Sequence, residues 1–464
     1  MRQLWDFPTG RRPSLLQRLT PPQLLLLSFV LLIVIGTLGL KTLPGLYTGE
    51  PLNWLDALFT ATSAVCVTGL VVVDTATYFT FRGQLFLLIL IQLGGLGTLT
   101  FASLVIVALG GRISLRQEAL SVGNPLEIGF HRINPRQLVR DVAVFTFGIE
   151  GIGILLLYGL WVPRLGWVEA VWPAVFHSIS AFCNAGFSTF SDSLMSFQND
   201  PLILLAVAAL VIAGGIGFLT LEELYLWRKA QREKRIFRLS LHSRLVLITT
   251  LILLLAPWPV YVWLEWDGTF AQLSFVDKLS NGFFIGVTAR TAGFNSIDHS
   301  KATEATNFLT IVLMAIGGSP GGMAGGMKTT TVALLAILAW SRLRGQEVAG
   351  VAGRSLRRET TDRAVGLFAI GFVSVTIGIL ILTMTERHTV PGAFLDRMFE
   401  AVSAFNIVGL SMGLTPHLTS GGRLVVIGLM FLGRVGPLAA AAALSARPSS
   451  ASKFRYAYEE VAVG

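Results

Sequence analysis

The chain of 464 residues is 53% hydrophobic and only 14% charged, with a mean hydropathy of +0.67. Soluble domains have about 25% charged residues, so this composition excludes a soluble globular protein and indicates an integral membrane protein. The net charge of +9 would also suit a nucleic-acid-binding protein, so the distribution of the basic residues has to decide between the two classes.

Eight apolar runs are long enough for helices that cross a hydrocarbon core about 30 Å thick. They lie near 22–46, 83–110, 142–162, 202–227, 243–266, 308–340, 363–385 and 422–445. The first run follows Arg11, Arg12 and Arg18, as the core of a signal peptide would. It is too long for such a core and no small-residue cleavage site follows it, so we interpret it as the first transmembrane helix.

Most of the basic residues lie in alternate connections between these runs. The basic connections are 1–20, 112–140, 228–244, 342–363 and 447–455. Because cytoplasmic loops are rich in Lys and Arg, this alternation predicts that both termini are cytoplasmic and that the other loops face outward. A basic nucleic-acid arm would not alternate in this way, so we expect no nucleic-acid partner.

Four short segments with a glycine recur along the chain. The glycines are Gly69 in SAVCVTGLVVVD, Gly186 in SAFCNAGFSTFSD, Gly293 in GVTARTAGFNSID and Gly409 in SAFNIVGLSMGLT. Their nearly even spacing indicates internal repeats, at 1–111, 112–228, 229–341 and 342–464. We therefore predict an all-α integral membrane protein with four membrane–pore loop–membrane repeats in a pseudo-fourfold arrangement around one pore.

An aromatic-rich segment of about 11 residues precedes each glycine and is too short to span a membrane. We expect these segments to be half-helices whose C-terminal carbonyls point toward the membrane centre, where they favour a cation. Backbone that returns from that depth must line a cavity or lie in protein, and glycine permits the turn through positive φ. A ring of such loops is the arrangement in which carbonyls replace the hydration shell of potassium.

A second glycine-containing pattern follows in the next apolar run of each repeat, at 93–100, 213–220, 316–322 and 432–439. Close helix packing by small residues explains the first two copies. The third belongs to GGSPGGMAGGMKTTT at 317–331, where six glycines and a proline predict a broken helix with an irregular loop below the filter. A nucleotide-binding P-loop is the alternative, but Met327 replaces the glycine before Lys328 and no βαβ pattern surrounds it.

Arg434 stands inside the last apolar run. Intramembrane arginine is costly and usually faces a cavity or partner, which favours a role in the pore over a structural ion pair. The chain has two cysteines, Cys66 and Cys183, each three residues before its glycine. A disulfide or metal pair is possible, but buried free cysteine is the preferred interpretation.

Three carboxylates, those of Asp74, Asp192 and Asp298, follow the glycines by five or six residues. They would form an acidic outer vestibule, or they are ordinary loop carboxylates. The sequence favours neither interpretation.

These residues together resemble the Trk/Ktr/HKT superfamily of potassium transporters. The resemblance rests on the four glycine loops, TARTAGFNSID at 288–298, the glycine-rich segment with Lys328, Arg434 and the ending YAYEEVAVG at 456–464. Eight spans and that ending make the chain most similar to the membrane subunit of the Ktr branch. The Trk-type (TrkH-like) branch is the nearer alternative.

The resemblance implies potassium uptake through a selectivity filter, with no enzymatic activity. The implied filter residues are Val67, Thr68, Gly69, Asn184, Ala185, Gly186, Thr291, Ala292, Gly293, Ile407, Val408 and Gly409. The implied gate consists of Gly317, Gly318, Gly321, Gly322, Gly325, Gly326, Lys328 and Arg434. The transported ion is potassium, held by filter carbonyls, with sodium as a possible activator and no organic cofactor.

The resemblance also implies a homodimer in the cell inner (plasma) membrane, in contact with membrane lipids. A cytosolic ring of nucleotide-binding (ATP/ADP), KtrA-like regulatory subunits would control it. The chain departs from the potassium-channel sequence TVGYG, since its loops read VTGL, NAGF, TAGF and IVGL. The number of ion sites in the filter therefore stays open.

Two other functional classes are compatible with parts of the sequence. A membrane ATPase would use the glycine-rich segment, but that segment lacks the carboxylates that hold magnesium near phosphates. A sodium-coupled cation symporter would have inverted repeats, whereas the four repeats here share one orientation, which favours a pore. Channel-like flux and coupled symport are not distinguished by these patterns.

The predicted cytoplasmic connections, 111–141, 228–242 and 341–362, are too short for a nucleotide-binding domain, so we expect regulation by a separate subunit. Basic residues in two of them would dock an acidic ring, and anionic lipid headgroups would attract the same residues equally well. These residues are Arg228, Lys229, Arg232, Lys234, Arg235, Arg354, Arg357 and Arg358.

Overall fold

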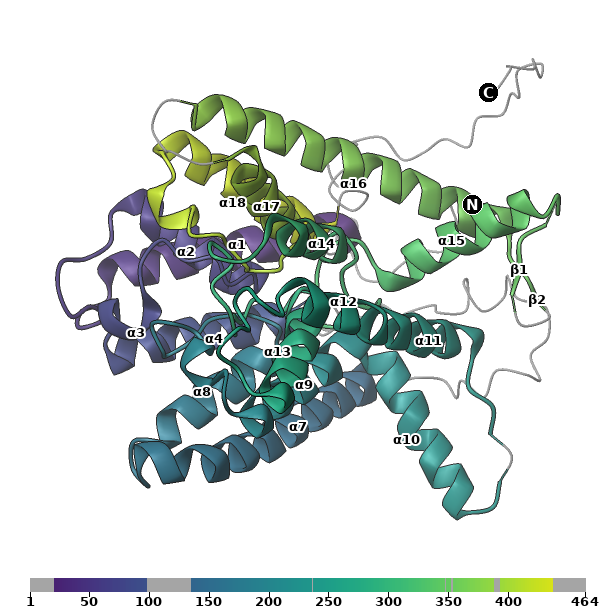
Figure 1. The fold of residues 1–464 in the computed structure, drawn as a ribbon, viewed down its shortest axis with the longest axis horizontal. Coiled ribbons are helices and arrows are strands. Elements are labelled where there is room, and N and C mark those ends of the chain that lie inside the picture. The colour runs from purple at the N-terminus through teal and green to yellow at the C-terminus, as the bar shows by residue number, and fades with distance from the viewer. Residues whose placement is uncertain are drawn as a thin grey trace, which may run out of the picture.

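The computed structural model describes residues 21–97, 135–235, 237–346, 348–351, 354–387 and 393–436. In this part of the chain one order of helices recurs four times: a long helix, a short helix that ends at a glycine loop, and a further helix. Figure 1 shows the helices gathered into one bundle, with α16 along one side and α10 projecting away from the others.

The elements of the first half are α1 (Pro21–Thr42), α2 (Trp54–Cys66), the one-turn α3 (Thr75–Tyr78), α4 (Phe81–Leu96), α7 (Pro135–Leu165), α8 (Val171–Phe182), η3 (Met195–Phe197), α9 (Pro201–Ile216) and α10 (Phe218–Arg232). Those of the second half are α11 (Leu241–Leu255), α12 (Pro257–Leu264), α13 (Phe275–Thr288), α14 (Glu304–Met314), α15 (Thr329–Leu343), β1 (Gly350–Val351), β2 (Arg354–Ser355), α16 (Arg358–Thr385), α17 (Phe394–Asn406), η4 (Thr415–His417) and α18 (Ser420–Val435).

Four apolar helices in the described part of the chain are long enough to cross a membrane: Gln23–Thr42, Arg140–Leu165, Leu241–Leu264 and Arg358–Thr385. Their outward faces expose large apolar side chains, such as Leu31, Leu155 and Phe372, which suit contact with lipid tails. The predicted runs 83–110 and 422–445 continue beyond residues 97 and 436, outside the described residues. The long apolar helices are those of a multi-pass membrane protein.

The predicted span at 202–227 is not one straight helix, because the helix is broken at Gly217. Helices α9 and α10 meet there at an angle of 100°. Gly217 has a φ of +94°, and a Cβ at this position would lie 2.6 Å from the carbonyl oxygen of Pro320. The Phe218 N–H then donates to the carbonyl of Gly321 at 2.9 Å, so a distant segment supplies the partner that a continuous helix would have supplied.

The apolar run at 308–340 is interrupted between α14 and α15. Two backbone hydrogen bonds close the intervening loop at its base, from Gly317 N–H to Met327 O at 2.8 Å and from Thr329 N–H to Gly318 O at 3.0 Å. Two strands of two residues each, β1 and β2, pair in antiparallel as a small hairpin in the connection between α15 and α16. This hairpin is a small departure from the all-α expectation.

Side-chain caps set the starts of several helices. Asn53, Thr80, Thr303 and Thr419 each accept a hydrogen bond from a backbone N–H in the first turn of the helix that follows. Such caps supply a partner for N–H groups that have none within the helix, and each contributes about 1 kcal/mol. Helices α2, α4, α14 and α18 therefore begin at positions set by the sequence.

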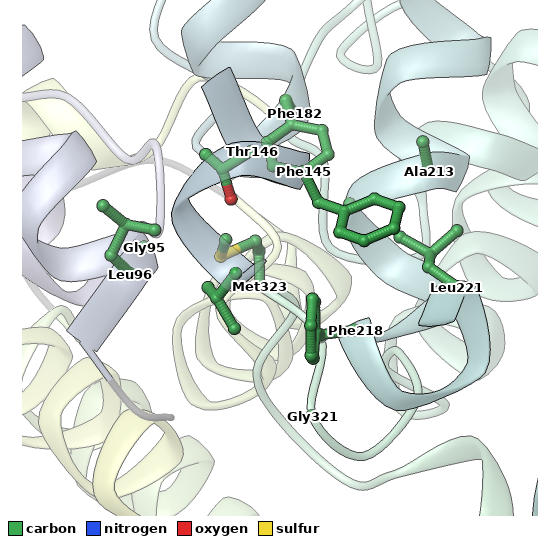
Figure 2. A pocket seen from close by; sticks show the side chains of 13 residues that line it. Gly95, Leu96, Phe145, Thr146, Phe182, Ala213, Phe218, Leu221, Gly321 and Met323 are labelled. Carbon is green, nitrogen blue, oxygen red and sulfur yellow. The ribbon is translucent and has the colours of Figure 1, made fainter. Parts of the chain in front are cut away.

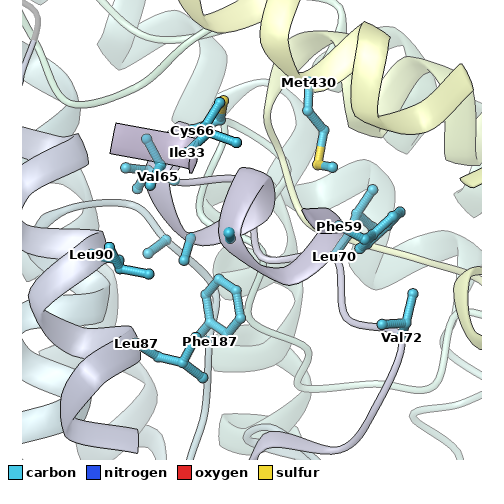
Figure 3. Packing of buried hydrophobic residues seen from close by; sticks show 14 of the residues in the cluster. Ile33, Phe59, Val65, Cys66, Leu70, Val72, Leu87, Leu90, Phe187 and Met430 are labelled. Atoms are coloured by element: carbon cyan, nitrogen blue, oxygen red, sulfur yellow. The ribbon is translucent and has the colours of Figure 1, made fainter. Parts of the chain in front are cut away.

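Helix α2 is buried between α1, α4 and α18, and Figure 3 shows this packing. Phe59 and Val65 of α2 are fully buried, together with Leu87 of α4 and Met430 of α18. The side chains of Asp56 on α2 and Arg423 on α18 form an ion pair in the same region. The first and last parts of the chain are thus joined, which brings the first and fourth glycine loops together.

Candidate functional site: four glycine loops and the loop beside them

Each of the short helices α2, α8, α13 and α17 leads into a glycine loop, and the four loops share an unusual backbone. We name them loop 1 (67–69), loop 2 (184–186), loop 3 (291–293) and loop 4 (407–409). The residue two before each glycine is left-handed, with φ of 61° at Val67, 59° at Asn184, 67° at Thr291 and 57° at Ile407. The four glycines have φ of +96°, +70°, +78° and +90°. Left-handed backbone is strained for β-branched residues such as Val67, Thr291 and Ile407, so tertiary structure must hold these loops.

The four glycines lie next to one another in a closed circuit. A Cβ on Gly69 would be 2.4 Å from Ala185 O, and one on Gly186 would be 2.9 Å from Ala292 O. The circuit continues from Gly293 to Val408 O at 2.6 Å and from Gly409 to Thr68 O at 2.1 Å. Each glycine therefore faces the carbonyl that precedes the next glycine, and any side chain at these positions would strike backbone.

Hydroxyl groups of the short helices hold these loops in place. Ser63 and Ser403 accept hydrogen bonds from the N–H of Gly69 and Gly409, at 3.2 and 3.1 Å. Ser180 and Thr288 instead donate to the carbonyls of Phe187 and Phe294, both at 2.8 Å. In all four cases the hydroxyl fixes the backbone at or directly after the glycine.

The polar groups that the four glycine loops bring together are backbone carbonyl oxygens. The C-terminal ends of α2, α8, α13 and α17 all meet the glycine loops, and helix C-termini present a partial negative charge. Carbonyl oxygens grouped in this way can take the place of water around an alkali cation. No cluster of three His, Cys, Asp or Glu side chains suitable for a metal ion occurs among the described residues.

The loop at 317–328 lies against the glycine loops and against helices far from it in sequence. A Cβ on Gly325 would be 2.3 Å from the Cδ1 of Ile407, so the backbone here touches loop 4. Ser319 and Met323 donate N–H bonds to the carbonyls of Gly215 and Gly214 at 3.0 and 3.1 Å. Glycine is required at Gly325, because an added Cβ would overlap the side chain of Ile407.

Arg434 ties the same loop to two helices. Its Nη1 donates to Met323 O and its Nη2 to Gly94 O, both at 2.6 Å. The side chain is 6% exposed and makes no ion pair with a carboxylate among the described residues. The predicted alternative of a structural ion pair is therefore not what the structure shows.

The other residues that the sequence predicts for a gate lie in the same loop. Lys328 is the N-cap residue of α15, and its ammonium donates to Ala324 O at 2.8 Å. The loop follows helix α14, and the described strands are the two short ones of the hairpin. This arrangement lacks the strand that precedes a P-loop, which overturns the nucleotide-binding interpretation of 317–331.

A cavity of about 30 Å³ lies between this loop and the helices around it. Figure 2 shows Met323 and Gly321 of the loop facing Thr146, Phe182 and Gly95 across this space. Its size allows about one or two water molecules. The loop therefore packs closely here and leaves little open space.

The three loop carboxylates are engaged in local hydrogen bonds. Asp74 caps α3 and accepts from Ser191 Oγ at 2.6 Å, which joins two loops far apart in sequence. Asp192 accepts from Ser196. Burial raises the pKa of Asp298, but bonds from Ser300 and the charge of Lys301 outweigh it and leave that pKa below its ordinary value. These contacts give all three carboxylates a structural role.

Both cysteines are free thiols, and both are fully buried. The Sγ of Cys183 lies 2.8 Å from the position of a Cβ on Gly95, so the thiol fills space between α4 and loop 2. It donates to Gln92 Oε1 at 3.4 Å.

Sequence reasoning missed three buried polar side chains near these loops. Glu150 on α7 is 2% exposed and accepts from Gln92 Nε2 at 3.0 and 3.2 Å. His177 and Glu400, on α8 and α17, are fully buried. The available signal was an ionisable residue inside an apolar run, which usually marks a functional position in membrane proteins.

The chain matches the family model described as TrkH, cation transport protein, over residues 22–455. It is 41% identical to Ktr system potassium uptake protein B of Bacillus subtilis, covering 96% of this chain and 97% of that protein. It is 36% identical to potassium/sodium uptake protein NtpJ of Enterococcus hirae, over 97% and 98% of the two chains.

The fold is similar to the crystal structure of the potassium transporter TrkH from Vibrio parahaemolyticus, with a TM-score of 0.74 at 17% identity. That alignment covers 95% of this chain and 87% of the other. The resemblance read from the motifs is confirmed: the chain belongs to the TrkH family of cation transport proteins, in the Trk/Ktr superfamily, and is KtrB-like.

Proposed function

We propose that this protein takes up potassium across the cell membrane through a selectivity filter formed by the four glycine loops. The observation that supports this most strongly is the closed circuit in which each glycine faces the carbonyl before the next glycine. With four short helices ending at that circuit, the four repeats surround one pathway in pseudo-fourfold arrangement. The filter residues are the three of each loop, and their carbonyls hold potassium.

The loop at 317–328 closes the pathway on the inner side of the filter. Its contacts with Ile407 and with the carbonyls of Gly214 and Gly215 support this placement. Arg434 holds the loop through Met323 O, and its positive charge opposes the passage of a cation. The six loop glycines, Lys328 and Arg434 together form the gate.

The protein works as a homodimer in the inner membrane, with both termini cytoplasmic and with a cytosolic ring of nucleotide-binding subunits that regulates it. The alternation of basic connections supports the orientation. The Bacillus subtilis relative is a component of a Ktr system, which supports a regulatory partner. The Enterococcus hirae relative is a potassium/sodium uptake protein, which supports a role for sodium here, either as a second transported ion or as an activator of potassium uptake.

Rubidium or potassium flux into proteoliposomes that contain the purified chain tests the filter. Gly69→Ser and Gly293→Ser place a Cβ within 2.4 and 2.6 Å of a neighbouring carbonyl, at positive φ. Both variants should lose the preference for potassium over sodium while remaining folded. The matched control is Gly428→Ala, in helix α18, where nothing lies within 4 Å of the added Cβ. Wild-type selectivity in both serine variants would contradict the proposed filter.

A further inference from the structure

In two of the four repeats, a pair of polar side chains connects the short helix to the residues just after the glycine of its loop. On α17, Glu400 accepts a hydrogen bond from Ser411 Oγ at 2.8 Å. On α8, His177 Nε2 lies 2.8 Å from Ser188 Oγ. Glu400 and His177 both stand nine residues before their glycine, and each serine stands two residues after it. The pairs therefore occupy the same register in loops 4 and 2.

The bonds of His177 define which of its ring nitrogens has the proton. Nδ1 lies 2.9 Å from the carbonyl of Pro173, which can only accept, so Nδ1 has the proton. In the neutral ring Nε2 must then accept, and the Ser188 hydroxyl donates to it. Phe190 stacks on the ring at 4.9 Å and Trp161 packs edge-on at 5.1 Å, so the imidazole has one fixed orientation.

Glu400 is held by two hydroxyl groups. Its second oxygen accepts from Thr415, whose side chain is buried. Ser411 Oγ accepts in turn from the Gly413 N–H at 3.1 Å, so the carboxyl group is linked to the backbone after loop 4. No basic side chain pairs with Glu400 in the part of the chain that the structure describes. The carboxyl group of Glu400 is thus bonded to the chain that follows loop 4 and not to a positively charged side chain.

Loops 1 and 3 lack this pair. In loop 1 the residue nine before the glycine is Thr60, whose hydroxyl has no partner among the described residues, and the residue two after the glycine is Val71. In loop 3 the backbone of Asn295 is instead bonded to Ser193 and Leu194, at 3.1 and 2.9 Å. Since the glycine circuit runs in chain order, loops 2 and 4 lie opposite each other in it, and the two polar pairs belong to these opposite loops.

We propose that His177–Ser188 and Glu400–Ser411 are positioning pairs that set the preference for potassium over sodium from two opposite sides of the pathway. This inference rests on the proposed filter. Selectivity depends on the number and distance of the carbonyl oxygens around the ion. A pair that fixes the chain after Gly186 or Gly409 keeps those carbonyls from closing around a smaller ion.

The test uses the full-length protein in proteoliposomes and measures the ratio of potassium to sodium flux. Ser411→Ala and Ser188→Ala each remove one hydroxyl oxygen and should lower this ratio at least about fivefold, since each lost hydrogen bond is worth about 1 kcal/mol. Because Glu400 and Ser411 act as one unit, adding Ser411→Ala to Glu400→Ala should lower the ratio no further than Glu400→Ala alone. Glu400→Gln keeps one oxygen that can accept from Ser411 and should restore most of the ratio.

The matched control is Thr60→Ala, in the same register of loop 1, which should leave the ratio unchanged. A Gly409→Ser arm separates this inference from the filter itself. The positioning inference is wrong, and the filter stands, if Gly409→Ser loses selectivity while Ser188→Ala and Ser411→Ala both keep it. It is also wrong if the effects of Glu400→Ala and Ser411→Ala add in the double variant. If Gly409→Ser itself keeps selectivity, the filter assignment fails and the inference fails with it.

Discussion

The guanidinium of Arg434 donates a hydrogen bond to the carbonyl oxygen of Met323 at 2.6 Å, across 111 residues of sequence. Its other nitrogen donates to Gly94 O, so one side chain connects α18, α4 and the loop at 317–328. Both acceptors are backbone carbonyls, and a carbonyl cannot neutralise the positive charge. The contact therefore positions the loop while it leaves a positive charge beside it.

Arg434→Ala should raise ion flux. Two charge-assisted hydrogen bonds of Arg434, each worth about 1.5–3 kcal/mol, hold the loop at 317–328 in place. Losing even part of this free energy should raise the rate of ion flux about tenfold or more. Flux into proteoliposomes is the measurement. The control is Arg164→Ala on α7, which removes the same charge from a partly exposed ion pair with Asp200 and should leave flux near wild type. Unchanged flux in a folded Arg434→Ala variant would count against a gate.

Alanine substitutions of the four loop glycines should differ in severity. The added Cβ meets backbone oxygen at 2.1 Å for Gly409, 2.4 Å for Gly69, 2.6 Å for Gly293 and 2.9 Å for Gly186. Potassium affinity in competition with sodium should therefore fall most for Gly409→Ala and least for Gly186→Ala. A ranking unrelated to these distances would show that local strain, and not the shared circuit, determines the effect.

Much of this site could be predicted from the sequence because it depends on residues close together in the chain. The glycine and the helix before it are local signals, and the four glycines do lie together in the structure. The glycine-rich run at 317–331 also indicated a break by composition alone. The partners of that loop could not be predicted in this way, since Gly214, Asn406 and Arg434 come from different parts of the chain.

The Glu386–Thr419 contact should contribute to stability without affecting selectivity. Glu386 is fully buried and accepts from the N–H and hydroxyl of Thr419, the N-cap residue of α18. Thr419→Ala should lower the free energy of unfolding by about 1–2 kcal/mol, measured as a lower melting temperature of the purified protein. The same change should leave the potassium-to-sodium flux ratio as it is, and a shifted ratio would mean that this cap supports the filter.

Reversal of the charges near the start of α16 tests the regulatory partner. Arg357 and Arg358 are exposed there, and Arg354 belongs to the hairpin before it. Changing all three to glutamate should abolish co-purification with a nucleotide-binding ring and remove the ATP/ADP dependence of uptake, because like charges then repel. Arg387→Glu, at the opposite end of α16, is the control. Retained nucleotide dependence would assign these residues to topology and lipid contact.

Two features were beyond prediction from sequence for physical reasons. The segment at 213–220 has the small residues of ordinary helix packing, and its break at Gly217 depends on Pro320 and Gly321 from another part of the chain. The pairs His177–Ser188 and Glu400–Ser411 each join residues on either side of a left-handed turn. Spacing alone did not show that such a turn would bring them within hydrogen-bond distance.

The break at Gly217 has a mechanical consequence. Helix α10 has 15 residues and projects from the bundle (Figure 1). Its first residue, Phe218, donates its N–H to the carbonyl of Gly321. Because this bond lies directly at the break, a different angle between α9 and α10 would displace the Phe218 N–H from the Gly321 carbonyl. The direction of α10 and the position of the loop at 317–328 are therefore linked at a single glycine.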